Sequence, residues 1–391
     1  MPFDPQLATA AYIDTLGADA LAKAQAYTQG GHWLILWGLV VSVLASWILV
    51  RGRWLDRLDA RKPGKGPNRR AFVIALATFV VLSLITLPWD LYSGWWRETA
   101  YGRSSQPIGD YLGQGALSMV ISSLLAALFF MGVYALIRRA GRLWWAWSAG
   151  LTAVSVAAML LVSPVVIEPL FNDYKPVPDG EVRDALLVMA ERAGVPADRI
   201  FVYDGSRQSN NFTANVSGVG GSARIAISDV AFKGASLDEV KAVTGHEIGH
   251  YVLGHVWRSV GILSLVAAVL FFLIDRLFPV AARALGSAAG VSDPLGLPVL
   301  LALVSVLGVF AQPVLNSLTR ISEAEADRYS LETVNLPDAL SSALVKTAEY
   351  RYPRPGVIEE VLFYSHPSVE KRVRAAMEWK AANLPLTGPG T

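Results

Sequence analysis

The sequence predicts a mainly α-helical polytopic membrane protein with a small α+β domain between its membrane-spanning helices. Three observations predict this class. Apolar residues make up 53% of the 391 residues and charged residues only 17%, a balance shifted away from soluble globular proteins and towards membrane proteins. Six apolar stretches reach or approach the length of about 20 residues that a helix needs to cross the hydrocarbon core. A polar stretch between the fourth and fifth combines helix and strand patterns.

The first 32 residues are expected to lie outside the hydrocarbon core. They contain Asp4, Asp14 and Asp19 and lack the basic start and early apolar run of a cleaved signal peptide. We expect residues 1–32 to form an N-terminal amphipathic segment, with a helix over Tyr12–Tyr27 on the membrane surface.

Six stretches are expected to be transmembrane helices, four within residues 33–167 and two within residues 259–316. Tryptophans lie near several of their edges, where amphipathic rings favour the membrane interface. The stretches are Trp33–Val50, Ala71–Leu87, Ala116–Ile137, Trp144–Ile167, Val260–Phe278 and Leu297–Leu315.

Residues 168–258 have the pattern of a small α+β domain. A helix is expected over Glu181–Ala193, because Gly194 follows it as a stop signal. Apolar runs between turn residues predict strands at Ile200–Tyr203 and Arg224–Ser228.

Further helices are expected after the second strand and after the last span. Ser236 and Glu239 form a capping box, Ser-x-x-Glu, at which a helix of the polar domain begins. The C-terminal residues 317–391 are expected to be largely helical, over Ser317–Thr347 and His366–Ala382.

Composition excludes several kinds of site. The net charge of +2 and the scattered basic residues do not indicate a nucleic-acid partner. The chain has no cysteine, so disulfides, thiolate ligands and a cysteine nucleophile are excluded. No Gly-x-Ser-x-Gly motif supports serine chemistry. Any transition metal must therefore be held by histidine and carboxylate.

One motif carries the chemistry. Residues 246–250 read His-Glu-Ile-Gly-His, and on a helix His246 and His250 share a face and can bind one metal ion. Glu247 lies beside them and can accept a proton from a water that the ion activates. This pattern predicts a zincin-like α+β metalloprotease domain over residues 168–258, with the motif on its active-site helix. The alternative is two ordinary histidines on a polar helix face.

A catalytic zinc site needs a third protein ligand. After the sixth span, residues 320–327 read Arg-Ile-Ser-Glu-Ala-Glu-Ala-Asp. Glu323 and Asp327 share a helix face, so one could bind the metal while the other orients a histidine. The spacing leaves Glu323 and Glu325 both open as the ligand, and a solvated acidic helix face is the alternative.

Two further histidines lie near these motifs or in the C-terminal part. His255 is about 140° round a helix from His250, so we expect it to support the structure or a ligand rather than to bind the metal. His366 precedes a proline in a loop before a helix. Taken alone, it would be assigned to the surface.

Several motifs together make the chain resemble a known family, the integral-membrane zinc metalloproteases of the type I CAAX prenyl protease, as a bacterial member. The resemblance covers roughly residues 71–374, and the order of the motifs makes it specific. The motifs are Glu168-Pro-Leu-Phe-Asn172, Pro178-Asp-Gly-Glu181, Val202-Tyr-Asp-Gly-Ser206, the His246–His250 motif extended to His255, Arg320…Glu323-x-x-Ala326-Asp327 and Ser365-His366-Pro367…Arg372.

The resemblance implies a role for each of several residues. It implies Glu323 as the third ligand of one Zn²⁺ per chain, with Asp327 supporting a ligating histidine. It implies that residues 317–391 supply this ligand, that His366 is catalytic beside Glu247, and that Arg372 helps to bind substrate.

The resemblance also implies that residues 211–218 form an edge strand that pairs with substrate backbone, with Asn211 and Asn215 contacting the substrate. Residues 213–218 read Thr-Ala-Asn-Val-Ser-Gly, whereas family members usually read Asn-Ala-x-x-Thr-Gly. A second departure concerns the spans, because eukaryotic members look like seven-span proteins and six are expected here.

Charge predicts the orientation in the membrane. Two short loops are strongly basic, and the positive-inside rule places both in the cytoplasm. The metalloprotease domain is then periplasmic in a bacterial inner membrane, whereas in the eukaryotic relatives the catalytic part faces the cytosol. The basic residues are Arg51, Arg53, Arg57, Arg61, Lys62, Lys65, Arg69 and Arg70 in one loop, and Arg138, Arg139 and Arg142 in the other.

The sequence therefore predicts a membrane-embedded zinc endopeptidase. Expected partners are the lipid bilayer and membrane-associated, lipidated or misfolded proteins or peptides as substrates. One alternative is a non-catalytic scaffold or lipid-handling protein with a structural zinc. Another is an intramembrane protease of the site-two type, but Glu239 and Lys241 indicate that the motif helix is polar.

Overall fold

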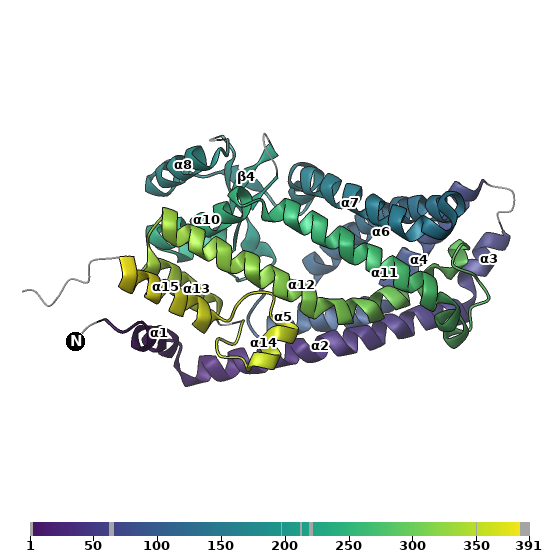
Figure 1. Cartoon of the computed structure of the whole chain (residues 1–391), viewed down its shortest axis with the longest axis horizontal. Helices are drawn as coiled ribbons and strands as arrows, with labels where there is room; N and C mark the ends of the chain where they lie inside the picture. Colours follow the sequence, from purple (N-terminus) through teal and green to yellow (C-terminus); the bar gives the residue numbers. More distant parts are fainter. Residues whose placement is uncertain are drawn as a thin grey trace, which may run out of the picture.

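The molecule is elongated, with long helices side by side over most of its length and a smaller group of helices and strands at one end (Figure 1). The computed structural model describes residues 3–61, 66–196, 198–211, 213–218, 222–348 and 350–383. This arrangement confirms the expected class, a mainly α-helical polytopic membrane protein with a small α+β domain.

The helices and strands are named in chain order. The first half contains α1 (Pro5–Asp14), α2 (Gly17–Gly52), α3 (Trp54–Ala60), α4 (Pro67–Asp90), α5 (Arg97–Ala100), α6 (Ile108–Ala140) and α7 (Trp144–Val162). The second half contains α8 (Glu181–Ala193), α9 (Asp229–Gly234), α10 (Leu237–Val252), α11 (His255–Leu285), α12 (Leu297–Thr333), α13 (Pro337–Thr347), α14 (Val357–Phe363) and α15 (Val369–Asn383).

The apolar stretches form long helices. Within the described residues, five helical segments are long and apolar enough to cross a membrane, namely Gly17–Gly52, Pro67–Ala100, Ile108–Leu170, His255–Leu285 and Pro294–Thr333. All six expected stretches lie in these segments, and two of them share the third segment. There, Gly141 with φ 53° separates α6 from α7, and the two helices pack against each other.

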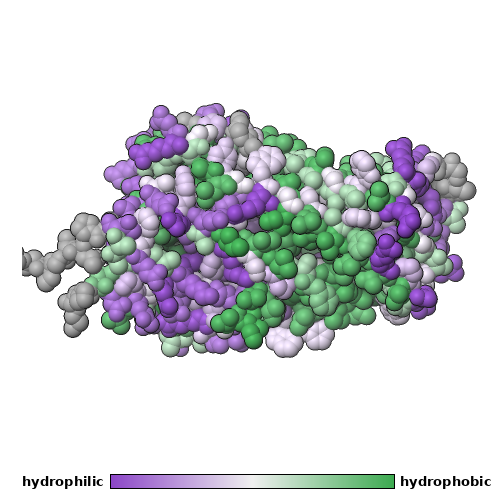
Figure 2. Space-filling model, viewed as in Figure 1, coloured by the Kyte–Doolittle hydropathy of each residue, from purple (hydrophilic) through white to green (hydrophobic). Residues whose placement is uncertain are grey.

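The surface of these helices is apolar. Figure 2 shows hydrophobic side chains gathered over α2, α11 and α12, with hydrophilic side chains at both ends of the molecule. Trp33, Leu265 and Phe310 on these helices are 64%, 68% and 76% exposed. A soluble protein rarely exposes so large an apolar surface, whereas lipid-facing helices must do so.

The N-terminal segment differs from the expectation. The helix expected over Tyr12–Tyr27 is interrupted at residues 15–16, because Gly17 adopts φ 76° at the start of α2. Residues 17–32 are continuous with the first apolar stretch, and α1 packs against α15. The buried Ile13, 0% exposed, joins the apolar core between these helices.

A mixed four-stranded sheet forms the β part of the small domain among the described residues. Its strands, β1 (Tyr174–Pro176), β2 (Ile200–Tyr203), β3 (Ala214–Ser217) and β4 (Arg224–Ser228), lie in the order β1-β2-β4-β3. The pair β2 and β4 is parallel and the other two pairs are antiparallel. The predicted bounds of α8, β2 and β4 are confirmed. Strand β3 forms one edge of the sheet, beside α10.

The C-terminal helices also differ from the expectation. The helix expected over Ser317–Thr347 is divided, because Asn335 has φ 56° and Pro337 begins α13. In the other direction α12 continues without a break into the last apolar stretch. The last helix begins at Val369 rather than His366, since a residue before proline disfavours helical backbone.

Candidate functional site

The helix α10 carries the His-Glu-x-x-His motif and is held firmly at its N-terminus. Ser236 Oγ accepts a hydrogen bond from Glu239 N at 3.2 Å, and Ser236 N donates to Glu239 Oε2 at 2.7 Å. The Glu239 carboxylate also binds Ser342 and Lys346 of α13, each at 2.7 Å. The predicted capping box is therefore confirmed, and it also anchors α10 to α13.

Two glycines let α10 approach α12 closely. A Cβ added to Gly245 would lie 2.5 Å from Val334, and one added to Gly249 would lie 3.2 Å from the Ala326 backbone. Across the same contact, Ser330 Oγ donates to Ala242 O at 2.7 Å. Small residues at the crossing therefore bring the motif helix against the helix that carries Glu323.

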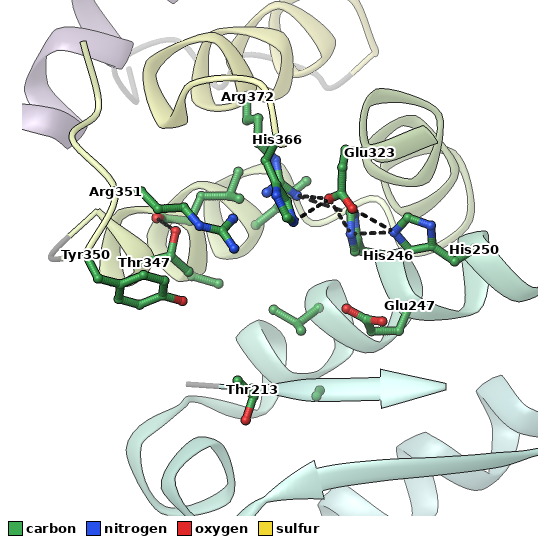
Figure 3. A pocket seen from close by; sticks show the side chains of 15 residues that line it. Thr213, His246, Glu247, His250, Glu323, Thr347, Tyr350, Arg351, His366 and Arg372 are labelled. Atoms are coloured by element: carbon green, nitrogen blue, oxygen red, sulfur yellow. Dashed lines mark hydrogen bonds and ion pairs between the residues drawn. The ribbon is translucent and has the colours of Figure 1, made fainter. Parts of the chain in front are cut away.

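Three side chains converge between these helices (Figure 3). His246 Nε2 lies 3.1 Å from His250 Nε2, and these atoms lie 3.3 and 3.4 Å from the two carboxylate oxygens of Glu323. His246 and Glu323 are each 7% exposed. The three residues form a group that could hold a metal ion.

The geometry of this group fits zinc. Ligand atoms about 2.0–2.2 Å from zinc stand about 3.3–3.6 Å apart in a tetrahedral site, close to the observed separations. The buried Glu323 Oε2 has no hydrogen-bond partner within the described part of the chain, which is expensive unless a cation satisfies it. Two histidine nitrogens and one carboxylate are a ligand set of catalytic zinc sites.

A buried carboxylate supports His246. Asp327 Oδ1 accepts from His246 Nδ1 at 2.9 Å. Arg372 donates to both oxygens of Asp327, each at 2.7 Å. Burial disfavours the imidazolium of His246, but the hydrogen bond to Asp327 and the nearby negative charge of Glu323 outweigh burial and raise its pKa to about 9. Asp327 thus fixes the ring so that its other nitrogen faces Glu323.

A second relay supports His250. Its Nδ1 lies 2.9 Å from His255 Nδ1, and His255 Nε2 lies 2.9 Å from Glu325 Oε2. Arg258 donates to the same oxygen of Glu325 at 2.6 Å. The two glutamates that the spacing left open therefore have different surroundings, because Glu323 joins the histidine pair and Glu325 binds His255.

Glu247 faces the cavity beside the histidines. It lines a cavity of about 250 Å³ together with the three converging residues, and Figure 3 shows its carboxylate between them and Thr213, which precedes β3. Burial raises the pKa of the Glu247 carboxyl above its ordinary value. A carboxylate with a raised pKa in such a cavity is a suitable general base.

His366 lies on the opposite side of Glu323 from His250 (Figure 3). Its Nε2 is 3.3 Å from Glu323 Oε2, and its Nδ1 is 2.9 Å from Ser365 Oγ. Burial and the nearby charge of Arg351 lower the pKa of His366 to about 3. The ring is therefore neutral near pH 7 and offers a single N–H donor.

The asparagines expected at the substrate do not line this cavity. Asn211 accepts a hydrogen bond from Arg103, and Asn215 lies on β3 opposite Ala226 of β4. The cavity wall on this side is instead made by Thr213 and Ala214. The neighbouring Phe212, also within the expected strand, lies outside the described residues.

Several residues of the site were not predicted from the sequence. Thr347, Tyr350 and Arg351 line the cavity, yet they lie at the end of a helix and in a loop without a recognisable motif. The relay from His255 to Glu325 could have been predicted from the sequence, because a histidine next to a metal motif and a nearby glutamate are the usual parts of such a support.

Comparison with known proteins is consistent with this geometry. The family model described as peptidase family M48 matches residues 176–380, and a model described as CAAX prenyl protease N-terminal, five membrane helices, matches residues 6–173. An uncharacterised metalloprotease of Bacillus subtilis, YhfN, is 29% identical over 88% of this chain and 80% of its own length. The human CAAX prenyl protease 1 homolog is 23% identical over 93% and 87%.

The fold is shared with a solved structure. The crystal structure of S. mikatae Ste24p superposes with a TM-score of 0.74 at 21% identity, over 92% of this chain and 89% of that one. The long apolar helices make the protein an integral-membrane protein. The family match covers more than half of the residues, and the chain therefore belongs to peptidase family M48.

Proposed function

We propose that this membrane peptidase is a zinc-dependent endopeptidase in which His246, His250 and Glu323 hold one zinc ion. The observation that carries the proposal is the convergence of their ligand atoms at 3.1–3.4 Å. Structural zinc sites take four protein ligands, whereas three residues converge in the described chain. The number of ligands favours a catalytic site over a structural zinc in a scaffold or lipid-handling protein.

Zinc bound there would acidify a water molecule and polarise a substrate carbonyl. Glu247 accepts the proton of the attacking water and delivers it to the leaving amine. Its raised pKa lies closer to neutral pH, which suits a group that first accepts and then releases a proton. Asp327 supports His246 throughout.

His366 stabilises the oxyanion. Its low pKa keeps the ring neutral, and Ser365 at Nδ1 would leave the proton on Nε2, the atom nearer to Glu323. A donor placed where negative charge develops lowers the barrier. Arg372 lines the cavity, where the expected substrate contact would be made, and it also donates to both oxygens of Asp327. It positions the site and adds positive charge to it.

Substrate pairs with β3. This strand is an edge of the sheet, and its first residue Ala214 and the preceding Thr213 line the same cavity as Glu323. A peptide added to this edge would place a backbone carbonyl beside the metal site. Asn211 and Asn215 would then act on the strand and its surroundings rather than at the scissile bond.

The chain is organised so that its transmembrane helices adjoin the catalytic residues. We propose transmembrane parts within residues 33–167 and 259–316, a protease domain over residues 168–258, and a C-terminal part from residue 317 that supplies Glu323. Substrates are membrane-associated proteins or peptides, lipidated or misfolded. The names of the relatives support lipidated substrates, and α12, which contains both an apolar stretch and Glu323, supports substrates at the membrane.

The active site faces the periplasm of a bacterial inner membrane. Arg138 donates a hydrogen bond to Asn68, so the two basic loops lie together. In Figure 1 the end with α3 lies opposite the end with α10. The positive-inside rule then places the loops in the cytoplasm. The residues His246, His250 and Glu323, here called the metal cluster, then lie on the other side.

The test is peptide-bond cleavage by detergent-purified protein, wild type against Glu247→Gln, with zinc assayed in both. We expect one zinc per chain in both and a fall in cleavage of about 10²–10⁴-fold in the variant. Glu332→Gln, an exposed change on α12, is the control. Equal cleavage by both proteins, or cleavage that survives removal of zinc by a chelator, would contradict the proposal.

A further inference from the structure

A second arginine, besides Arg372, lines the cavity beside the metal cluster. Arg351 follows α13 and lines the same cavity as Glu247, Glu323 and His366. Figure 3 shows its guanidinium directed into the cavity, on the opposite side of His366 from His250. Its side chain is half-buried, so it cannot be fully hydrated by bulk water.

The other arginines around the site are occupied. Arg372 is bound by both oxygens of Asp327, and Arg258 is bound by Glu325. Arg320 donates to backbone carbonyls, among them Glu360 O at 2.9 Å. Each of these three guanidinium groups therefore already has an acceptor within the chain.

Arg351 lacks such a partner. Within the described residues, its guanidinium makes no hydrogen bond and no ion pair, and its contact is the ring of Tyr350, 5.5 Å from the guanidinium carbon. Burial lowers the pKa of Arg351, which reflects the cost of keeping this charge from water. A desolvated guanidinium with no acceptor is unfavourable unless a ligand supplies one.

No described residue of the cavity supplies this acceptor. Among the described residues that line the cavity, two are carboxylates, Glu247 and Glu323, and neither forms an ion pair with Arg351. Glu323 faces the histidines, and Glu247 is the proposed base. Guanidinium binds planar carboxylates through two parallel hydrogen bonds, so a substrate carboxylate is the group that fits.

We propose that Arg351 is a specificity-determining residue that binds a carboxylate of the substrate near the scissile bond. This inference rests on the proposed peptidase function and names a class of substrate for it. The carboxylate comes either from a free C-terminus close to the cleaved bond or from an aspartate or glutamate side chain. In both cases the peptide is anchored on the side of the cavity away from His250.

The test compares three matched fluorogenic peptides with wild-type protein and Arg351→Gln. One peptide ends in a free carboxylate near the scissile bond, one ends in an amide, and one ends in an amide but carries a glutamate at the same distance. Wild type should cleave at least one carboxylate peptide with a kcat/KM about tenfold or more above the neutral amide. Arg351→Gln should abolish that preference, so that the acid and amide peptides are cleaved with similar kcat/KM values.

Two controls keep the result specific. Arg354→Gln changes a neighbouring arginine that binds Glu370 at 3.1 Å, outside the cavity, and it should keep the preference. Arg351→Lys should restore part of it, because the charge remains. Zinc content of each variant reports whether the metal cluster is intact.

The outcomes separate this inference from the function itself. Wild type that treats acid and amide peptides alike, or Arg351→Gln that slows them equally, would overturn the inference while leaving the peptidase intact. If wild type cleaves no peptide, binding of the same peptides to Glu247→Gln still decides. Tighter binding of an acid peptide that depends on Arg351 supports the inference, and equal binding overturns it.

Discussion

The two histidines of the metal cluster are held by supports of opposite kinds. His246 is held by Asp327, which is 5% exposed and has both oxygens bound by Arg372. His250 is held through His255 by Glu325, whose side chain is 43% exposed. The first support is a closed, buried set of charges, and the second is a relay that ends at the solvent.

One helix supplies the two kinds of support. Asp327 is four residues from Glu323 on α12 and shares its face, whereas Glu325 is two residues away and about 200° round the helix. Charges removed from water are favourable only as a complete set, and exposed ion pairs contribute about 0–1 kcal/mol. The same chemical change should therefore do much more harm in the buried support.

The largest effect is expected for Arg372→Met. This change leaves Asp327 as a buried carboxylate with one histidine partner, and breaking a buried pair costs about 3–5 kcal/mol. Thermal unfolding of the detergent-solubilised protein should show this as a strong fall in Tm, together with loss of zinc. A variant as stable as wild type would show that the buried support is not a charge-balanced unit.

Asp327→Asn should act mainly on the metal. The amide can still accept from His246 but does not carry the charge that strengthens the ligand, so zinc affinity should fall about 10–100-fold. Competition with a chelator of known affinity measures this. Glu332→Gln, a carboxylate on α12 that is 44% exposed and bound to Arg328, is the matched control. Unchanged affinity in Asp327→Asn would exclude a supporting role.

The pH dependence of zinc binding tests the same support. In protein stripped of zinc, the pKa of His246 is raised to about 9, from about 6.5 in the unfolded chain. Its protonated form therefore stabilises the fold below about pH 6.5. This contribution is lost as pH rises through 9. Zinc must displace this proton. Its affinity should therefore rise up to about tenfold per pH unit between about 6.5 and 9. A flat profile, measured by chelator competition, would contradict this.

The smallest effect is expected for Glu325→Gln. The side chain is exposed, and the amide can still accept from His255, so unfolding should change by less than about 1 kcal/mol. Any change should shrink as salt is added, because exposed charges are screened. A loss as large as that of Arg372→Met, measured by the same thermal unfolding, would remove the distinction between the two supports.

The sequence predicted those parts of the molecule that depend on local pattern. Apolar length located the long helices, and the capping box located the start of α10. The bounds of β2 and β4 followed from apolar runs between turns. Where a single residue decides the backbone, as Gly17 and Asn335 do with positive φ, the pattern gave helices that the chain interrupts.

The metal cluster lay partly beyond sequence reasoning because it is assembled from distant segments. Spacing on α12 could not separate Glu323 from Glu325, since only the approach of α10 across Gly245 and Gly249 decides which face meets the histidines. Arg351 has no motif at all. Its position follows from the course of the chain after α13, which no local pattern encodes.

The most direct measurement is the zinc content of wild type, Glu323→Gln and Glu325→Gln, purified in parallel under the same conditions. The two variants carry the same chemical change two residues apart on one helix. We predict one zinc per chain in wild type and in Glu325→Gln, and loss of zinc in Glu323→Gln. Full zinc in Glu323→Gln, or loss confined to Glu325→Gln, would contradict the proposed metal centre.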